Sequence, residues 1–278
     1  KELRSAVQEE FLVSLIIRDG EVIIPSGDTI IKENDIVYIL ARKDNYRKIL
    51  KQSGKSVQKI DKIVIVGGGR IGRLVVRDLV DRNKKITLID NNYDNCKELS
   101  ELFPEALIIH GDISDEGIFE EEQLYNYDLI ITATDNQELN ILTAVYAKSL
   151  GTKRAVSLVA KSNYLNIANN LGIDATISPK ISTVDAILKF VRKGNINSVH
   201  SLFEGKAEVI EFLVDEKNPI SDIPIKDLDL PENFLILSVI RNNEDFLPGG
   251  NFKIQTGDSI ITIVKKESIP KVEEFISG

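Results

Sequence analysis

The chain has 278 residues, 42% of them hydrophobic and 28% charged, which is typical of a globular protein with two or three domains. The formal net charge of −8 and the absence of a basic block argue against a nucleic-acid partner. The single cysteine, Cys96, excludes an intrachain disulfide, and no apolar run reaches the ~18–20 residues of a membrane-spanning helix.

The amino-terminal segment, residues 1–53, predicts a small module of mixed α and β structure. It contains two strand-like runs, over 11–17 and 36–40, followed by a helix over 45–52. The polar stretch 53–56, which reads Ser-Gly-Lys-Ser, predicts a linker after this module.

From Lys62 onward, apolar runs alternate with segments of helical spacing. Residues 63–66 are all β-branched, which is typical of a strand that is buried on both faces of a sheet. The predicted strands are 63–66, 86–89, 106–109, 129–132, 155–159 and 175–177, and the predicted helices are 71–82, 93–102, 139–149, 164–170 and 184–192. This alternation predicts the α/β class, with a Rossmann-like, doubly wound parallel sheet over residues 60–195.

The last part of the chain, residues 200–278, predicts a second small α+β module. It carries strand-like runs over 207–213, 234–240 and 259–264 and a helix over 269–276. The fold therefore has a parallel sheet in the middle of the sequence and one small module on each side of it.

The two small modules share a sequence pattern at a constant offset of 223 positions. The residues that recur are Phe11, Leu12, Arg18, Glu21, Pro25, Gly27 and Asp35 in the first copy and Phe234, Leu235, Arg241, Glu244, Pro248, Gly250 and Asp258 in the second. By this offset, the first copy has no counterpart for the part of the second module that precedes Pro224. Because the chain begins with Lys1 and contains no methionine, we expect it to be a fragment that starts inside a domain.

A glycine-rich loop follows the first strand of the predicted sheet and reads Gly67-Gly68-Gly69-Arg70-Ile71-Gly72. It matches the pattern G-x-G-x-x-G, in which Gly67 allows the tight turn, Gly69 admits a pyrophosphate and Gly72 permits close helix packing. The helix that follows points free N–H groups and the positive end of its dipole at the anion. Arg70 can add a charge-assisted hydrogen bond.

A carboxylate, Asp90, ends the second strand of the predicted sheet, 21 residues after Gly69. At this position an acid binds the 2′-hydroxyl of an adenosine ribose and repels a 2′-phosphate, so the sequence favours NAD over NADP. The alternative is a Rossmann-like domain that has lost its ligand.

Two further strand ends carry polar residues. Asp112 and the backbone of Ile113 follow the third strand and can frame an adenine, while Thr134 and Asp135 follow the fourth strand and can face the ribose or the phosphates. Asp112 and Asp135 can also be the N-cap residues of the following helices, and the two roles are compatible.

The sequence offers no recognisable catalytic or metal-binding set. His110 ends a strand and is expected to be a packed side chain, and His200 has no cysteine or paired carboxylate near it. Tyr93 and Lys97 have the spacing of some dehydrogenase pairs, but their helix follows the second strand and we interpret them as surface residues. We therefore predict a chain that holds a dinucleotide without catalysis, with no metal site. The alternative is an NAD-dependent oxidoreductase whose catalytic residues are not recognisable.

These motifs resemble those of RCK domains, the regulators of potassium conductance, and of the TrkA family, cytosolic NAD-binding subunits of Trk potassium-uptake systems. The resemblance rests on Ile63 to Asp90, on Gly111-Asp112, and on Ala133 to Asn136 with Asn140. It continues through Ser178 to Gly194 and Val199 to Glu208. The order of the segments matches a partial C-lobe (1–53), an N-lobe with its crossover helix (60–195) and a complete C-lobe (200–278).

The resemblance implies a nucleotide site and a regulatory role. The implied contacts are Gly67, Gly68, Gly69, Arg70, Ile71, Asp90, Asp112, Thr134 and Asp135. The implied ligand is NAD or NADH, with ATP or ADP as further possibilities. Some relatives carry an arginine in the fifth strand near the phosphates, where this sequence has Leu158.

The resemblance also implies partners and a location. It implies dimers and rings of RCK units that gate a membrane-embedded potassium transporter of the TrkH or TrkG type. The location would be cytoplasmic, at the inner face of the cell membrane. The apolar helix 184–191 is a candidate dimer element, with packing inside its own domain as the alternative, and the C-lobe can hold a second small ligand.

Overall fold

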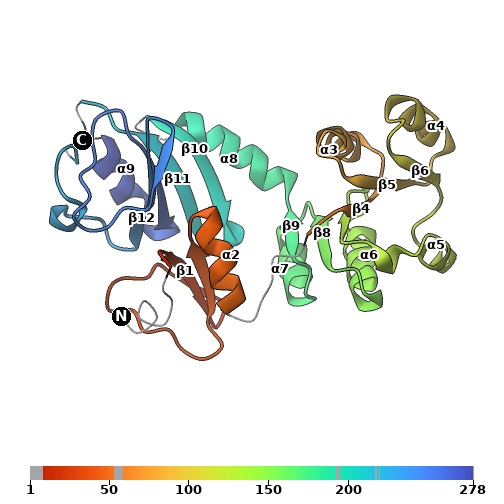
Figure 1. Ribbon diagram of the computed structural model, residues 1–278, viewed down its shortest axis with the longest axis horizontal. Coiled ribbons are helices and arrows are strands. Elements are labelled where there is room, and N and C mark those ends of the chain that lie inside the picture. Colours follow the sequence, from red (N-terminus) through yellow and green to blue (C-terminus); the bar gives the residue numbers. More distant parts are fainter. Residues whose placement is uncertain (1–8, 53–58, 192–194, 217, 219, 278) are drawn as a thin grey trace. The chain divides into compact units, whose positions relative to one another are not determined.

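A computed structural model describes residues 9–52, 59–191, 195–216, 218 and 220–277 (Figure 1). The predictions for Lys1, for the linker 53–56 and for the last residue of the helix 184–192 lie outside these residues. Contacts divide the chain into an α/β unit, residues 58–180, and a repeat unit, residues 1–57 with 181–278. No described helix is long and apolar enough to cross a lipid bilayer.

The α/β unit is built on a six-stranded parallel sheet with the order β6-β5-β4-β7-β8-β9. Its strands are β4 (Lys62–Val66), β5 (Lys85–Asp90), β6 (Leu107–His110), β7 (Leu129–Thr132), β8 (Arg154–Leu158) and β9 (Ala175–Ile177). Its helices are α3 (Arg70–Val80), α4 (Tyr93–Leu102), α5 (Glu116–Glu121), α6 (Gln137–Leu150) and α7 (Ser162–Asn170). The predicted α/β class and doubly wound parallel sheet are confirmed.

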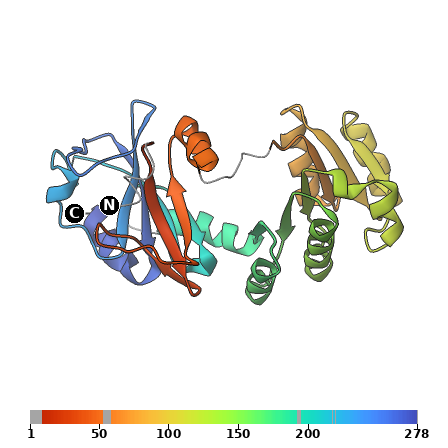
Figure 2. The same cartoon turned by 60° about the horizontal axis from the view of Figure 1, so that its bottom comes forward.

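Helices cover both faces of this sheet, with α3 and α4 on one side and α6 and α7 on the other (Figures 1 and 2). Ile63, Ile65 and Leu88 of the central strands pack with Val76 of α3 and Leu99 of α4. All four residues of the β-branched run are buried, as expected for a strand between two helical layers. The strand order reverses between β4 and β7, and this is where such sheets open a crevice at their carboxyl edge.

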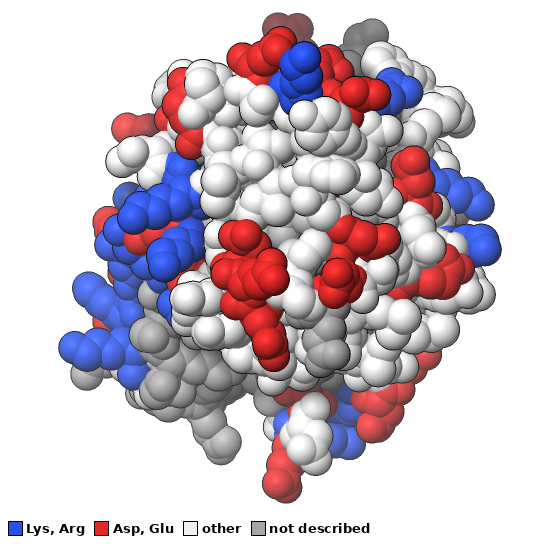
Figure 3. Space-filling model, turned by 90° about the vertical axis from the view of Figure 1, so that its right-hand side faces the viewer, with Lys and Arg blue, Asp and Glu red and all other residues white. Residues whose placement is uncertain are grey.

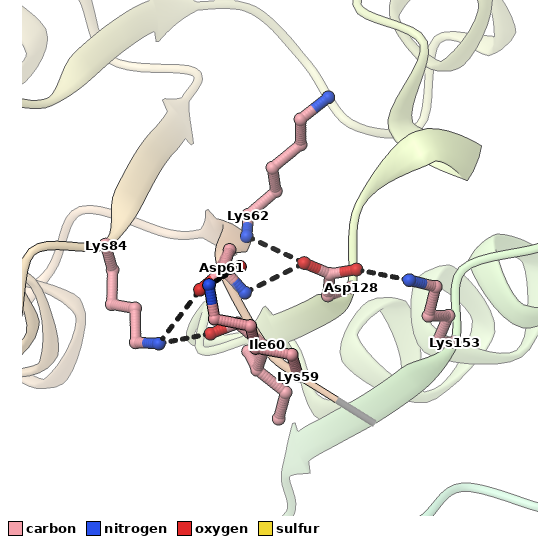
Figure 4. A network of polar contacts seen from close by, with 7 residues as sticks. All are labelled: Lys59, Ile60, Asp61, Lys62, Lys84, Asp128 and Lys153. Atoms are coloured by element: carbon pink, nitrogen blue, oxygen red, sulfur yellow. Dashed lines mark hydrogen bonds and ion pairs between the residues drawn. The ribbon is translucent and has the colours of Figure 1, made fainter. Parts of the chain in front are cut away.

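The amino edge of the sheet is held by Asp128 (Figure 4). One oxygen accepts the N–H groups of Asp61 and Lys62 at 2.8 and 2.9 Å, and the other accepts from Lys153 at 2.6 Å. These hydrogen bonds, that of Lys153 first, hold the pKa of Asp128 far below its ordinary value. Lys84 extends the network by bonding the Ile60 carbonyl, so the beginnings of β4, β5, β7 and β8 are tied together.

The repeat unit contains two antiparallel sheets, ordered β2-β1-β3 and β10-β11-β14-β12-β13. Its strands are β1 (Leu12–Arg18), β2 (Glu21–Ile23), β3 (Ile36–Leu40), β10 (Ile196–Leu202), β11 (Ala207–Leu213), β12 (Phe234–Arg241), β13 (Glu244–Phe246) and β14 (Ser259–Lys265). Its helices are α2 (Lys43–Gln52) and α9 (Ile269–Ser277), and α8 (Pro179–Val191) leads into it from the α/β unit. The sequence pattern missed β2, β10 and β13, which are short, polar or both.

The two copies of the repeat fold alike, residue for residue. Leu12 pairs with Leu40 as Leu235 pairs with Ile263, and both sheets have an irregularity at the same place, after Val13 and after Ile236. The copies pack on each other through one cluster that contains equivalent residues, because β1 lies beside β12 (Figures 1 and 2). The constant offset therefore describes three-dimensional equivalence as well as sequence similarity.

Each copy contains the same arginine–aspartate pair. Arg18 bonds both oxygens of Asp35 at 2.9 and 2.8 Å and the Ile30 carbonyl at 2.7 Å. Arg241 bonds Asp258 at 2.7 and 2.8 Å and the Lys253 carbonyl at 2.9 Å. Both aspartates are 1% exposed at the side chain, and each also accepts a backbone N–H at 2.8 Å. The pair therefore fixes the loop between the hairpin and the following strand in both copies.

We expect the contribution of Asp35 to stability to disappear at low pH. The Arg18 hydrogen bond, followed by the Lys32 N–H, lowers the pKa of Asp35 from 3.8 to about 2. A carboxylate whose pKa is lowered by folding stabilises the protein above pH ~4, and this stabilisation is lost as the pH falls through ~2. The denaturation midpoint of wild type should therefore exceed that of Asp35→Asn at neutral pH, and the difference should shrink between pH ~4 and ~2.

The matched control is Asp28→Asn, which removes an exposed carboxylate from the same loop. Its midpoint should follow that of wild type over the whole pH range. A constant difference between wild type and Asp35→Asn down to pH ~2 would contradict the prediction.

Candidate functional site

A cavity of about 310 Å³ opens at the carboxyl edge of the sheet, around the point where the strand order reverses. It is lined by Val66, Gly67, Ile89, Asp90, Asn91, Gly111, Asp112, Ile113, Thr134, Asp135, Asn136 and Leu139. Six of the predicted site residues are in this lining: Gly67, Asp90, Asp112, Ile113, Thr134 and Asp135. The ends of β4, β5, β6 and β7 therefore bring together residues that are far apart in the sequence.

The glycine loop is constrained by close backbone contacts. Gly67 has φ +102°, and a side chain there would place Cβ 2.7 Å from the Ala133 carbonyl oxygen. A Cβ on Gly72 would lie 1.9 Å from the Gly67 carbonyl oxygen, so α3 begins in direct contact with the turn. A Cβ on Gly69 would meet no atom within 4 Å. Gly67 and Gly72 therefore serve the fold, whereas Gly69 leaves open space in front of the helix.

Asp90 braces the same loop from the neighbouring strand. One carboxylate oxygen accepts the Gly68 N–H at 2.6 Å and the other accepts the Asn92 N–H at 2.9 Å. Arg73 of α3 bonds the Gly68 carbonyl at 3.3 Å and holds Glu98 of α4 at 2.6 Å. The pKa of Glu98 is lowered by that contact. The peptide groups of Gly68 are thus fixed on both sides, and Asp90 faces the cavity with its orientation already set.

Asp112 and Asp135 do not cap the following helices, so the N-cap interpretation of both residues is wrong. The N-cap of α5 is Asp115 and the N-cap of α6 is Asn136, whose side chain accepts the Leu139 N–H at 2.9 Å. Asp112 instead accepts the hydroxyl and N–H of Ser114, and these bonds lower the pKa of Asp112. Asp135 is exposed and has no hydrogen bond or ion pair among the described residues.

The loop after β7 is locked by Asn140, which is 1% exposed. Its side-chain oxygen accepts from the Thr134 N–H at 3.0 Å and from the Thr134 hydroxyl at 2.6 Å. Its nitrogen donates to the carbonyls of Thr134 and Leu158, both at 3.0 Å. Asn140 therefore joins the ends of β7 and β8, a role that its place in the family motif does not by itself predict.

The helices that begin at this edge differ at their first residues. The N-caps of α4, α5 and α6 are Asn92, Asp115 and Asn136, and each accepts a backbone N–H of its own helix. The N-cap of α3 is Gly69, which has no side chain to do so. The start of α3 therefore keeps free N–H groups at the positive end of the helix, beside the open space in front of Gly69.

Five predicted site residues lie outside the lining of the cavity: Gly68, Gly69, Arg70, Ile71 and Gly72. Arg70 is exposed at the first position of α3, without an ion pair among the described residues, and Ile71 is 36% exposed. Gly68 is held between Asp90 and Arg73, and Gly72 supports the turn from below. They belong to the loop beside the cavity, and Gly69, Arg70 and Ile71 are exposed there.

Matches to known protein families divide the chain in nearly the same way as the α/β unit and the two copies of the repeat. The TrkA-N domain matches residues 63–179, and the TrkA-C domain matches both 1–54 and 209–277. The chain belongs to the TrkA family. The two matches to the TrkA-C domain fall on the two copies of the repeat.

Curated relatives are similar over nearly the whole chain. The Trk system potassium uptake protein TrkA of Halomonas elongata is 31% identical over 95% of this chain and 58% of its own length. TrkA homolog 1 of Methanosarcina mazei is 29% identical over 95% of this chain and 59% of its own length. The chain therefore spans less than two thirds of these relatives. The crystal structure of the GsuK RCK domain covers 99% of this chain and 58% of its own, at 16% identity and a TM-score of 0.45.

The histidines of this TrkA-family chain lie outside the cavity. His110 is exposed, and its ring packs edge-on against Tyr93 at 5.5 Å and lies near the Asn91 carbonyl. The expectation that His110 is a packed side chain is therefore wrong, because β6 is an edge strand of the sheet. No group of three His, Cys, Asp or Glu residues among the described part of the chain is arranged to hold a metal ion.

Figure 3 looks onto the end of the α/β unit where α4, β6 and α5 lie. Uncharged residues fill the centre of this view, acidic residues lie below the centre and at the top, and basic residues gather at the left. This face of the TrkA-N domain therefore has no continuous basic surface across its centre of the kind that a phosphate backbone requires.

Replacing Gly72 with alanine should destabilise the α/β unit. The new Cβ would overlap the Gly67 carbonyl, and overpacking of this kind costs about 1–3 kcal/mol of unfolding free energy. At about 2–4 °C per kcal/mol, the melting temperature should fall by roughly 2–12 °C. Gly69→Ala is the matched control, because its Cβ meets no atom, and its melting temperature should fall by less than that of Gly72→Ala, since only the weaker N-cap preference of alanine is added. Equal melting temperatures for both variants would contradict this explanation of the loop.

Proposed function

We propose that this chain is the nucleotide-binding, regulatory part of a potassium uptake protein, with NAD or NADH as its ligand. The observation that carries the proposal is the glycine turn that opens onto the uncapped start of α3, with Asp90 fixed beside it. Free N–H groups at a helix start bind a pyrophosphate, and a carboxylate at the end of the next strand accepts the hydroxyls of a ribose.

The proposed contacts extend along the edge of the sheet. Gly69 and Arg70 receive the pyrophosphate, Asp90 receives the adenosine ribose, and the Asp112–Ile113 turn frames the adenine. Thr134 and Asp135 meet the rest of the ligand. The same features accept an adenine mononucleotide, so ATP and ADP belong to the proposed ligand class.

The regulatory role follows from the family and from the site. The curated relatives are named as potassium uptake proteins, and we propose that this chain acts with a membrane-embedded potassium transporter subunit of the TrkH or TrkG type from the cytoplasmic side of the membrane. Self-association into dimers and rings would let the ligand favour one arrangement. A nucleotide can shift such an equilibrium only by its differential affinity for the two states, typically worth about 1–3 kcal/mol.

The proposed domain boundaries assign residues 1–53 to a partial C-lobe, 60–195 to the N-lobe and 200–278 to a complete C-lobe. The two C-lobe segments correspond to the two copies of the repeat, whose registers agree. An oxidoreductase would need a proton donor beside the nicotinamide. Among the described residues the lining of the cavity contains no histidine, lysine or tyrosine, which favours regulation over catalysis.

Calorimetric titration with NAD, NADH, ATP and ADP tests this function. Wild type should bind at least one of these nucleotides saturably, and Asp90→Ala should weaken binding by about tenfold or more, because a buried hydrogen bond to a charged group is worth about 1.5–3 kcal/mol. Asp90→Asn is the matched variant, because it keeps an oxygen for the Gly68 N–H while it removes the charge.

Loss of binding in Asp90→Ala with an unchanged melting temperature would show that the substitution removes a ligand contact and does not unfold the protein. Failure of all four nucleotides to bind wild type would contradict the proposed function, and turnover of NADH by the purified chain would favour the oxidoreductase.

A further inference from the structure

Charge is unequally distributed around the cavity. The lining contains three carboxylates, those of Asp90, Asp112 and Asp135, and among the described residues it contains no lysine or arginine. Of the two arginines that follow the glycine turn, Arg73 is already engaged by Glu98 and Asn95. Arg70 is exposed and remains available. A highly anionic ligand therefore meets more negative than positive groups here.

The three carboxylates differ in the hydrogen bonds that they already accept within the protein. Both oxygens of Asp90 accept backbone N–H groups, and one oxygen of Asp112 accepts the N–H and hydroxyl of Ser114. Asp135 has neither a hydrogen bond nor an ion pair within the described part of the chain, and it is exposed to the cavity. Asp135 is thus the carboxylate whose full charge and hydrogen-bonding capacity are available to a ligand.

The backbone on both sides of Asp135 is fixed. Thr134 is held by three hydrogen bonds with the Asn140 side chain, and Asn136 caps α6 through the Leu139 N–H. The loop therefore has little freedom to withdraw Asp135 from a phosphate that approaches it. The repulsion is built into the site rather than relieved by a loop movement.

Beside the glycine turn, the features that favour an anion are the uncapped start of α3 and Arg70. A dinucleotide carries its charge in one central pyrophosphate and presents ribose hydroxyls on either side of it. A triphosphate instead extends its charge away from the adenosine. A carboxylate accepts hydrogen bonds from hydroxyls and repels phosphates, so the two ligand classes meet Asp135 with opposite consequences.

We propose that Asp135 is a specificity-determining residue that selects ligands with a ribose beyond the pyrophosphate over ligands with a terminal phosphate. This inference rests on the proposed function and names the ligand class of the same site. NAD and ADP-ribose belong to the favoured class, ADP is intermediate, and ATP is disfavoured unless a divalent cation neutralises its charge.

Calorimetric titration of the full chain with NAD, ADP-ribose, ADP and ATP, all in EDTA, tests the selection. Wild type should bind NAD and ADP-ribose about tenfold more tightly than ATP, as expected for one unscreened charge contact near the surface. Raising the salt concentration from about 0.05 M to about 0.5 M should strengthen ATP binding, because screening weakens repulsion. An ordinary phosphate site would show the opposite salt dependence.

Asp135→Asn should bind ATP about tenfold more tightly than wild type and should lose the salt-induced gain, while NAD binding stays the same or weakens. Glu138→Gln is the matched control, because it removes the same charge three residues further along, outside the lining. It should leave the ratio of NAD to ATP affinity within about twofold of wild type.

ATP binding that is tighter than NAD binding in wild type and unchanged in Asp135→Asn would overturn the selection and leave the nucleotide-binding function intact. Equal weakening of NAD and ATP in Asp135→Asn would also overturn it, since Asp135 would then be a general contact. Failure of every nucleotide to bind wild type would overturn the proposed function, and the selection with it.

Discussion

The contact between the start of α3 and the glycine turn is the constraint on which the site depends. The backbone of Gly72 approaches the Gly67 carbonyl so closely that no side chain fits between them, and Gly67 in turn lies against Ala133 at the end of β7. These two contacts bring a helix start, a strand end and a neighbouring loop to one point. The sheet order places that point where β4 and β7 diverge, so the cavity is a direct consequence of the close backbone packing.

The two edges of the parallel sheet are built in opposite ways. At the amino edge, Asp61 and Asp128 are satisfied by Lys84, Lys153 and backbone N–H groups, and the network joins the beginnings of four strands. At the carboxyl edge, the carboxylates face a cavity and one of them has no partner among the described residues. Satisfied polar groups stabilise a fold, whereas available ones can accept a ligand, which is the use we propose for the carboxyl edge.

The repeat unit contains the same arginine–aspartate pair in each of its two copies. In each copy a nearly buried aspartate receives an arginine and a backbone N–H, and the arginine also bonds the carbonyl five residues before the aspartate. Such a pair requires every one of its partners, because a lone buried charge is costly. This requirement explains why the arginine and the aspartate recur at an unchanged offset, while some of the apolar residues near them differ, as Ile16 and Val239 do.

The sequence by itself determined the α/β class, the parallel sheet and the equivalence of the two repeat copies. Continuous apolar runs, helical spacing and a constant offset can all be recognised in the sequence without knowledge of the contacts in the structure. Six of the residues predicted for the site line the cavity, because a G-x-G-x-x-G loop and the ends of parallel strands converge by geometry. The strands β2, β10 and β13 were missed, since their residues become strands only by pairing with neighbours.

Only the tertiary structure decided which polar side chains already have hydrogen-bond partners within the protein. Asp112 and Asp135 both follow a strand and precede a helix, yet Asp115 and Asn136 are the caps. The sequence marks Asn140 as part of the family motif, but only the structure shows that it joins the ends of β7 and β8. The physical reason is that a hydrogen bond depends on distance and direction between groups from different strands, and these are set by packing rather than by the order of residues along the chain.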